Sequence, residues 1–346
     1  MSQHQASQEQ KEPSIPSADG AGHTPVLVDA VVRYMRPHPG GIYVDGTIGL
    51  GGHSRALLRA ESDIRIVGID RDRTALDRAA RRLEEWQDRV SFHHERFSEL
   101  ANVLRAEGVS SVDGVLLDVG VSSMQLDTAE RGFSFRRNGP LDMRMNEEDE
   151  TTAAELIRSA SEAELVRIFR GYGEERFAAR IARHVVRTRQ ERAIESTATL
   201  ADTISDAVPK RFHVPGFHPA TRCFQALRIA VNDELVQLSA GLEAAYDALH
   251  PGGILVVISF HSLEDRLVKQ FLRHKEAACI CPPELPVCMC DKKQEMKQLT
   301  RRPVVADAAE KERNPRARSA KLRAGMKLPV TNDPNGTDMC HPPACP

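Results

Sequence analysis

The segment that decides the fold of this chain is Tyr43-Val44-Asp45-Gly46-Thr47-Ile48-Gly49-Leu50-Gly51-Gly52-His53-Ser54. It contains a short apolar run, then an acid, then four glycines within seven positions. This order predicts a strand, a tight turn and the N-terminus of a helix, because glycine adopts positive φ freely and lets the backbone approach a ligand closely. In open α/β folds such a turn lies at the carboxyl edge of a parallel sheet, where nucleotide-like ligands bind.

Two acids near the turn bear on the ligand, and Asp45 alone distinguishes S-adenosylmethionine from a dinucleotide. Asp45 precedes the first glycine, where a carboxylate would repel the pyrophosphate of a dinucleotide but would suit the ammonium group of S-adenosylmethionine. Asp70 ends the next apolar run, 66–69, where a carboxylate accepts hydrogen bonds from ribose hydroxyls. Because NAD has the same ribose, an NAD-dependent dehydrogenase remains the alternative from a second enzyme class.

Composition and charge narrow the class of protein further. The 346 residues are 41% hydrophobic and 28% charged, which is ordinary for a globular protein of two domains or of one domain with an insertion. The net charge of -2 excludes a global positive field toward nucleic acid. Seven cysteines, an odd number, and a polar N-terminus without a signal-peptide core predict a cytoplasmic protein. The longest apolar run, 254–260, is too short to span a bilayer, so no membrane partner is expected.

Strands and helices alternate regularly after the glycine turn. Strands are predicted at 65–70, 90–93 and 112–119, with helices at 73–86 and 97–107 between them. The run 112–119 is nearly all apolar, as expected for a strand that is covered on both faces. This βαβ rhythm predicts an α/β fold with a parallel, doubly wound sheet.

The rhythm breaks after the fourth strand. The next clear strand is 254–259, which starts 136 positions after Asp118, whereas a crossover needs about a dozen residues plus a helix. Roughly a hundred residues are therefore inserted. Capping-box patterns that start at Thr152 and Ser161 predict that the insertion is mostly helical. One helix, 224–242, is predicted to resume the main domain.

Polar side chains follow the fourth and fifth strands, and these are the catalytic candidates. Asp118 is expected beside the end of the first strand, where it could accept the hydrogens of an exocyclic amine during methylation. The alternative is an ordinary turn cluster. Phe260 could stack on a base taken out of its helix, and His261 could hydrogen-bond to that base. The alternative there is a core phenylalanine beside a helix that Ser262 caps.

Two local concentrations of positive charge could contact RNA phosphates. Arg176, Arg180, Arg183 and Arg187 are spaced to form one stripe on a helix of the insertion, although such stripes are usually just solvated faces. The segment 292–327 has 12 Lys and Arg against 4 Asp and Glu in an otherwise nearly neutral chain.

Four cysteines lie close together in the last quarter of the chain. Cys279-x-Cys281 and Cys288-x-Cys290 bracket a Pro-Pro pair, and four thiols at this spacing could hold zinc. The C-x-C spacing differs from the usual C-x2-C, and no histidine completes a familiar pattern. The sequence therefore predicts no metal site and favours reduced surface thiols, with zinc as the open alternative.

Several motifs together resemble the bacterial 16S ribosomal RNA cytosine-N4 methyltransferase family. They are His23-Thr24-Pro25-Val26, Asp45-Gly46-Thr47-x-Gly49-x-Gly51-Gly52-His53-Ser54, Asp118-x-Gly120-Val121-Ser122-Ser123, Asp142-Met143-Arg144-Met145, Phe224-Gln225-Ala226-Leu227-Arg228-Ile229, Ser259-Phe260-His261-Ser262-Leu263-Glu264-Asp265-Arg266 and Asn314-Pro315-Arg316-Ala317-Arg318-Ser319. The match runs from about residue 23 to residue 327. It implies an enzyme that uses S-adenosylmethionine to methylate N4 of a decoding-centre cytidine in 16S ribosomal RNA.

The resemblance also implies an architecture and a partner. The expected fold is a class I S-adenosylmethionine-dependent methyltransferase, a Rossmann-like doubly wound sheet, with an inserted helical domain. The methyltransferase domain is expected at 23–127 and 220–327, the helical substrate-recognition domain at 128–219, and disordered tails at 1–22 and 328–346. The implied partner is 16S rRNA within the small ribosomal subunit, and a homodimer is an open alternative to a monomer. A ribosome-assembly protein with a relict cofactor pocket is the third hypothesis.

The family's cofactor contacts can be carried over by motif. They fall on Gly51, Gly52, His53, Asp70, Phe97, Asp118 and Gln125. On this assignment Phe97 packs against adenine, and Asp118 becomes mainly a cofactor contact. The chain departs from the family at Met124, where Pro is usual, and at Asn146, where Asp is usual. The first departure could loosen the loop that presents Gln125.

Overall fold

A seven-stranded sheet forms the centre of the molecule. The computed structural model describes residues 25–282, 285 and 287–329, so the predicted tails lie outside the described residues except for 328–329. The strands lie in the order β3-β2-β1-β4-β5-β7-β6. Their bounds are β1 Ile42–Asp45, β2 Arg65–Asp70, β3 Val90–His94, β4 Val112–Asp118, β5 Leu249–Ser259, β6 Met296–Gln298 and β7 Lys321–Lys327.

The first five strands are the predicted ones, and they are parallel. The expectation of a wholly parallel sheet is wrong at one edge, because β7 pairs antiparallel with β5 and β6 pairs antiparallel with β7. The sequence signal for β7 is weak because the strand lies in the basic C-terminal segment. Its Arg323 is buried and donates a hydrogen bond of 2.7 Å to Asp265, so this charge serves the fold.

Helices cover both faces of the sheet. The first face carries α1 (Val28–Met35), α2 (Gly52–Ala60) and α3 (Arg73–Arg82), and the second carries α4 (Leu100–Ala106), α11 (Glu234–Ala248) and α12 (Ser262–Glu276). Successive strand residues point to opposite faces, so Leu116 joins the first core and Leu117 the second. Within the described residues, every helix is too short or too polar to cross a membrane.

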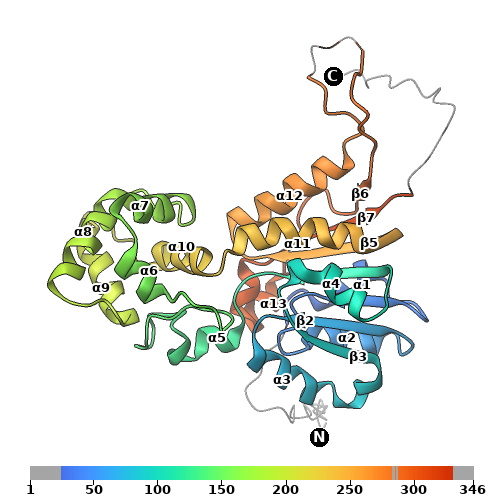
Figure 1. Ribbon diagram of the computed structural model, residues 1–346, viewed down its shortest axis with the longest axis horizontal. Coiled ribbons are helices and arrows are strands. Elements are labelled where there is room, and N and C mark those ends of the chain that lie inside the picture. Colours follow the sequence, from blue (N-terminus) through green and yellow to red (C-terminus); the bar gives the residue numbers. More distant parts are fainter. Residues whose placement is uncertain (1–24, 283–284, 286, 330–346) are drawn as a thin grey trace, which may run out of the picture.

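The segment between β4 and β5 forms a helical lobe beside the sheet (Figure 1). After the short α5 (Ser123–Asp127), the lobe contains α6 (Ala153–Ser159), α7 (Glu162–Gly171), α8 (Ala178–Glu191), α9 (Thr197–Ala207) and α10 (Thr221–Val231). These five helices share a core that is distinct from the two cores of the sheet. The predicted capping boxes are confirmed, because the side chains of Thr152 and Ser161 accept the N–H groups of Glu155 and Glu164.

The helix predicted at 224–242 is two helices, α10 and α11. Between them, Asp233 has a φ of 50°. The side chain of Asn232 accepts a hydrogen bond from Met145 N and donates one to Met143 O, and these bonds tie the break to the start of the insertion. The break lets α10 pack in the core of the helical lobe while α11 packs on the sheet.

A buried ion pair joins the sheet to the insertion. Asp72 caps α3 with one carboxylate oxygen, and the other oxygen accepts hydrogen bonds of 2.8 Å from both Gln125 and Arg131. Arg131 also donates to the carbonyls of Arg144 and Met145. Because both partners of the pair are buried, removal of one leaves the charge of the other uncompensated.

We expect Arg131→Ala to lower the free energy of unfolding by about 3–5 kcal/mol, because Asp72 would keep only the neutral Gln125 as its side-chain donor. Arg137→Ala is the matched control, since Arg137 is exposed and donates to a backbone carbonyl; its loss should stay below about 1 kcal/mol. Urea unfolding followed by the fluorescence of Trp86, the only tryptophan of the chain, measures both variants. If the two variants lost the same free energy of unfolding, the ion pair between Arg131 and Asp72 would not stabilise the fold as described.

Candidate functional site

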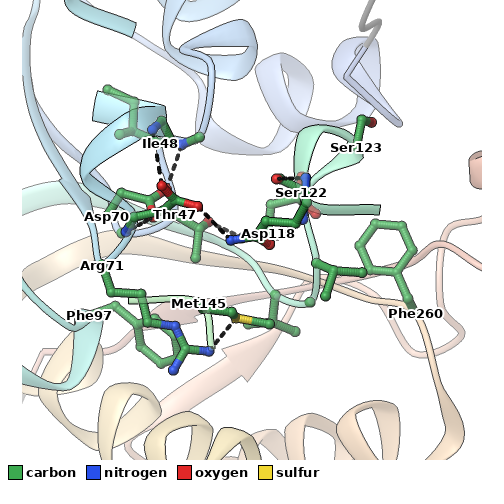
Figure 2. Close-up of a pocket in the computed structure, with 18 of the residues that line it drawn as sticks. Thr47, Ile48, Asp70, Arg71, Phe97, Asp118, Ser122, Ser123, Met145 and Phe260 are labelled. Carbon is green, nitrogen blue, oxygen red and sulfur yellow. Dashed lines mark hydrogen bonds between the residues drawn. The ribbon is translucent and has the colours of Figure 1, made fainter. Parts of the chain in front are cut away.

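The turn between β1 and α2 forms one wall of a pocket at the carboxyl edge of the sheet (Figure 2). Gly49 and Gly51 have φ angles of 53° and 74°, as expected for glycines in such a turn. A Cβ on Gly52 would lie 2.8 Å from the ring of Pro25, so this glycine lets the start of α2 pack closely against the N-terminal segment. At this wall the glycines therefore expose backbone atoms to the pocket.

Most of the predicted site residues line this one pocket. They are Gly52, His53, Asp70, Phe97, Asp118, Gln125 and Phe260. Gly51 and His261 are not among the lining residues. In Figure 2, Asp70 and Phe97 lie on one side, Ser122 and Phe260 lie on the other, and Asp118 lies between them.

The structure corrects the expectation for Asp45. Its side chain is 1% exposed, and its carboxylate accepts a hydrogen bond of 2.7 Å from Ser54 Oγ. Burial raises the pKa of Asp45, although His53 and Ser54 act in the opposite direction. Asp45 therefore ties the end of β1 to the first turn of α2 and does not line the pocket, where it could have met an ammonium group.

Asp70 lies at the end of β2 and borders the pocket. Its Oδ2 accepts a hydrogen bond of 2.8 Å from Gly49 N, and its Oδ1 accepts one of 2.9 Å from Asp72 N. Burial raises the pKa of Asp70 to about 6, because the loss of solvent outweighs these two hydrogen bonds. Each oxygen of the ionised carboxylate keeps a lone pair, so the group can still accept hydrogen bonds from the hydroxyls of a ribose.

His53 and Asp118 form a polar pair on the pocket wall, with 3.4 Å between His53 Nε2 and Asp118 Oδ2. Burial lowers the pKa of His53, but the carboxylates of Asp118 and Asp45 raise it by more, so the net shift is upward. Both ring nitrogens of His53 and the Oδ1 of Asp118 are buried without a hydrogen-bond partner among the described residues. Because buried polar atoms normally have partners, these atoms fit a ligand with charged groups.

Phe97 provides a flat apolar surface on the pocket wall. A Cβ on Gly241 of α11 would lie 2.3 Å from its ring, and a Cβ on Gly46 of the turn would lie 3.2 Å from its own Cβ. These two glycines leave the space that the phenylalanine occupies between α11 and the turn. An aromatic ring fixed in this way can pack against a planar base.

Gln125 lines the pocket, but protein groups engage both ends of its amide. Its Oε1 accepts a hydrogen bond of 3.0 Å from Ser122 N, and its Nε2 donates one of 2.8 Å to Asp72. Ser122 Oγ accepts from Gln125 N, which completes a capping box at the start of α5. The capping box is formed although Met124 stands at the position where the family usually has Pro.

Phe260 lines the pocket directly after β5, where a Cβ on Gly120 would lie 3.4 Å from its ring. The N-cap of α12 is His261 rather than Ser262, because His261 Nδ1 accepts the N–H of Glu264 at 3.4 Å. The carboxylate of Glu264 accepts the N–H groups of Phe260 and His261 at 2.8 and 3.2 Å. As the N-cap of α12, His261 thus stabilises the segment that places Phe260 at the pocket.

Sequence reasoning missed several lining residues. They are Arg71, Asp72, Met145, Glu234, Glu264 and Arg316. Arg71 donates to Asn232 O and contacts the sulfur of Met145. Met145, Glu264 and Arg316 lie in motifs on which the family resemblance rests. Their place in these motifs could have indicated that they line the pocket. Nothing in the sequence around Asp72 and Glu234 indicated that these residues line a pocket.

The arginine stripe is largely confirmed. Arg180, Arg183 and Arg187 are exposed on α8, whereas Arg176 precedes the helix and stacks on Phe177, with 4.6 Å to the ring centroid. In the C-terminal segment part of the charge is paired: Arg316 donates to Asp127 at 2.8 Å. On α8, Arg180 and Arg187 are exposed, and Arg183 between them forms an ion pair of 3.6 Å with Glu162.

Comparison with known proteins identifies the family. The family model described as the MraW methylase family matches residues 20–328. This chain belongs to that family. Two curated relatives are named Ribosomal RNA small subunit methyltransferase H: the protein of Geobacter sulfurreducens is 54% identical over 88% of this chain and 99% of its own length, and that of Trichlorobacter lovleyi is 51% identical over 88% and 98%.

The chain is therefore a methyltransferase of the class I α/β type, and its cofactor is S-adenosylmethionine. Among solved structures, a putative methyltransferase from Streptococcus mutans in complex with SAH is similar over 89% of this chain and 100% of its own, with 9% identity and a TM-score of 0.41. A putative rRNA methylase from Clostridium thermocellum has 12% identity and a TM-score of 0.41 over the same shares.

We expect Gly241→Ala to weaken binding of S-adenosylmethionine by about tenfold, because the new methyl group would displace the Phe97 ring from the pocket wall. Gly171→Ala is the matched control, since a Cβ on Gly171 meets no atom within 4 Å. Calorimetric titration of both variants gives the two dissociation constants. If the Gly241→Ala chain is folded but binds as tightly as the control, Phe97 does not contact the cofactor.

Proposed function

We propose that this methyltransferase methylates N4 of a decoding-centre cytidine in 16S ribosomal RNA of the small subunit, in the cytoplasm. The names of its relatives support ribosomal RNA as the substrate. The observation that carries the proposal is that a single pocket joins Asp70 and Asp118 to Phe260 and Arg316. The carboxylates suit a nucleoside with a sulfonium group, and an aromatic ring in the same pocket suits a base that stacks on it.

The contacts of the pocket residues suggest a role for each in holding the cofactor. Asp70 accepts hydrogen bonds from the ribose, and Phe97 packs against adenine. His53 and Asp118, which keep buried atoms without protein partners, bind the carboxylate and the ammonium group of the amino-acid part. Gly51 and Gly52 shape the turn, and Gln125 fixes the loop after β4. The bound cofactor supplies an electrophilic methyl group.

The other side of the pocket receives the cytosine. Phe260 stacks on the base once it is extruded from the RNA fold, and His261 positions Phe260 through the cap of α12. When bound, the cofactor would supply its methyl group to the N4 lone pair, and the electron pair of the broken C–S bond would stay on sulfur. The amine then loses a proton to water, so the pocket needs no general base. Proximity and exclusion of water supply most of the acceleration.

The helical lobe is assigned to RNA binding. On this assignment residues 128–219 recognise the substrate and 23–127 with 220–327 form the methyltransferase domain, although α10 shares the core of the lobe. Arg180, Arg183 and Arg187 present positive charge on an exposed face of α8. Phosphate contacts from such a face add affinity without sequence preference, and the pocket then selects the base.

To test the proposal, small ribosomal subunits are purified from a strain that lacks the gene. They are incubated with the purified protein and isotopically labelled S-adenosylmethionine. Mass spectrometry of the digested RNA should find the label in N4-methylcytidine at one position. Arg180→Ala with Arg187→Ala should lower incorporation by about tenfold at unchanged cofactor affinity, because two phosphate contacts are lost. The control, Arg78→Ala with Arg81→Ala, removes two exposed arginines of α3 and should leave the incorporation of label unchanged.

Three outcomes would contradict the proposal. Label on another atom would refute the N4 assignment. Cofactor binding without any label in RNA would favour the ribosome-assembly hypothesis. Tight binding of NAD without binding of S-adenosylmethionine would favour a dehydrogenase.

A further inference from the structure

The four clustered cysteines lie in the excursion of the chain between α12 and β6, which extends away from the sheet (Figure 1). All four Sγ atoms lie within 4.8 Å of one another, although two residue pairs bring them from separate parts of the excursion. The Sγ of Cys288 lies 3.4, 3.9 and 3.6 Å from those of Cys279, Cys281 and Cys290, and the Sγ atoms of Cys279 and Cys290 are 3.7 Å apart.

We propose that Cys279, Cys281, Cys288 and Cys290 bind one Zn²⁺ ion. In a tetrahedral zinc site with Zn–S bonds of about 2.3 Å, neighbouring sulfurs are about 3.8 Å apart. The observed separations of 3.4–3.9 Å match that edge. They are far from the S–S bond of a disulfide, which is about 2.05 Å.

Backbone N–H groups support thiolate ligands at this site. Ile280 N donates to Cys290 Sγ at 3.4 Å, Cys281 N donates to Cys279 Sγ at 3.3 Å, and Met289 N donates to Cys281 Sγ at 3.3 Å. Such bonds from the surrounding backbone orient metal ligands and offset their negative charge. The donors come from both C-x-C segments of the excursion, so the backbone is already shaped around the sulfurs.

Hydrophobic packing does not explain why the thiols meet. The apolar side chains around them are exposed: Ile280 by 57%, Leu285 by 43%, Val287 by 70% and Met289 by 81%. A segment without a core of its own needs another cross-link to hold one conformation, and a bound metal supplies it. Among the described residues the cluster holds four sulfur ligands and no histidine or carboxylate, which favours zinc over magnesium or calcium.

The sequence-based expectation of no metal site considered each C-x-C pair by itself. Within one pair, a single intervening residue departs from the common zinc motif. The structure instead places the two pairs opposite each other, so each pair supplies two of the four ligands. The site lies outside the methyltransferase pocket, and the inference does not depend on the proposed RNA substrate.

The test uses the full chain without a histidine tag, expressed with zinc in the medium and purified with a reductant. Elemental mass spectrometry should find about one zinc per chain. Replacement of the four cysteines by serine should remove the zinc and leave binding of S-adenosylmethionine unchanged, which shows that the variant is folded. Cys340→Ser with Cys345→Ser is the matched control, since these two cysteines do not belong to the two C-x-C pairs of the sequence, and it should keep the metal.

Cobalt exchanged into the protein should give the strong visible spectrum of a tetrahedral thiolate site. Chelation should make the excursion more susceptible to a protease, and added Zn²⁺ should reverse this. The proposal is overturned if the wild-type chain contains no more zinc than the variant without the four cysteines. It is also overturned if mass spectrometry finds two disulfides among the four in the reductant-purified protein.

Discussion

The hydrogen-bond register of β1 between β2 and β4 is the constraint on which the site depends. Asp45, the last residue of β1, pairs with Gly68 on one side and with Leu116 on the other. Asp70 and Asp118 are each two residues beyond these partners. Both carboxylates therefore lie about 6–7 Å past the end of β1, on the same face of their strands, with the glycine turn between them. A shift of either strand by one residue would turn its acid to the opposite face.

The acids around this edge differ in how their charge is compensated. Asp45 is paired with Ser54 beneath the turn, and Asp72 is paired with Arg131 at the entry to the insertion. These two groups are parts of the fold. Within the pocket lining, His53 and Asp118 keep buried polar atoms without partners among the described residues. The polar atoms of the pocket that lack a hydrogen-bond partner in the protein are thus the atoms that a charged cofactor can bind.

The sequence predicted whatever depends on local pattern. Five strands, the helical insertion and the capping boxes followed from periodicity, glycines and turn residues. Among the pocket residues, Asp70, Asp118 and Phe260 followed from their place after strands, whereas His53, Phe97 and Gln125 came from the family resemblance. It failed where distant segments decide the outcome. The break between α10 and α11 depends on the loop that contains Met143, and the buried Arg323 of β7 depends on Asp265 of α12 as its partner. None of these pairs has a signature within a single window of sequence.

The most direct test of this account is the pH dependence of S-adenosylmethionine binding. The pKa of Asp70 is raised to about 6, and only its ionised form accepts both ribose hydroxyls. Calorimetry should find the wild-type dissociation constant rising as the pH falls below about 6, by about tenfold per unit. Asp70→Asn should bind more weakly at neutral pH, by about 1–3 kcal/mol, and should lack this dependence. Identical affinities and pH profiles for the two proteins would show that the cofactor does not bind at this edge of the sheet.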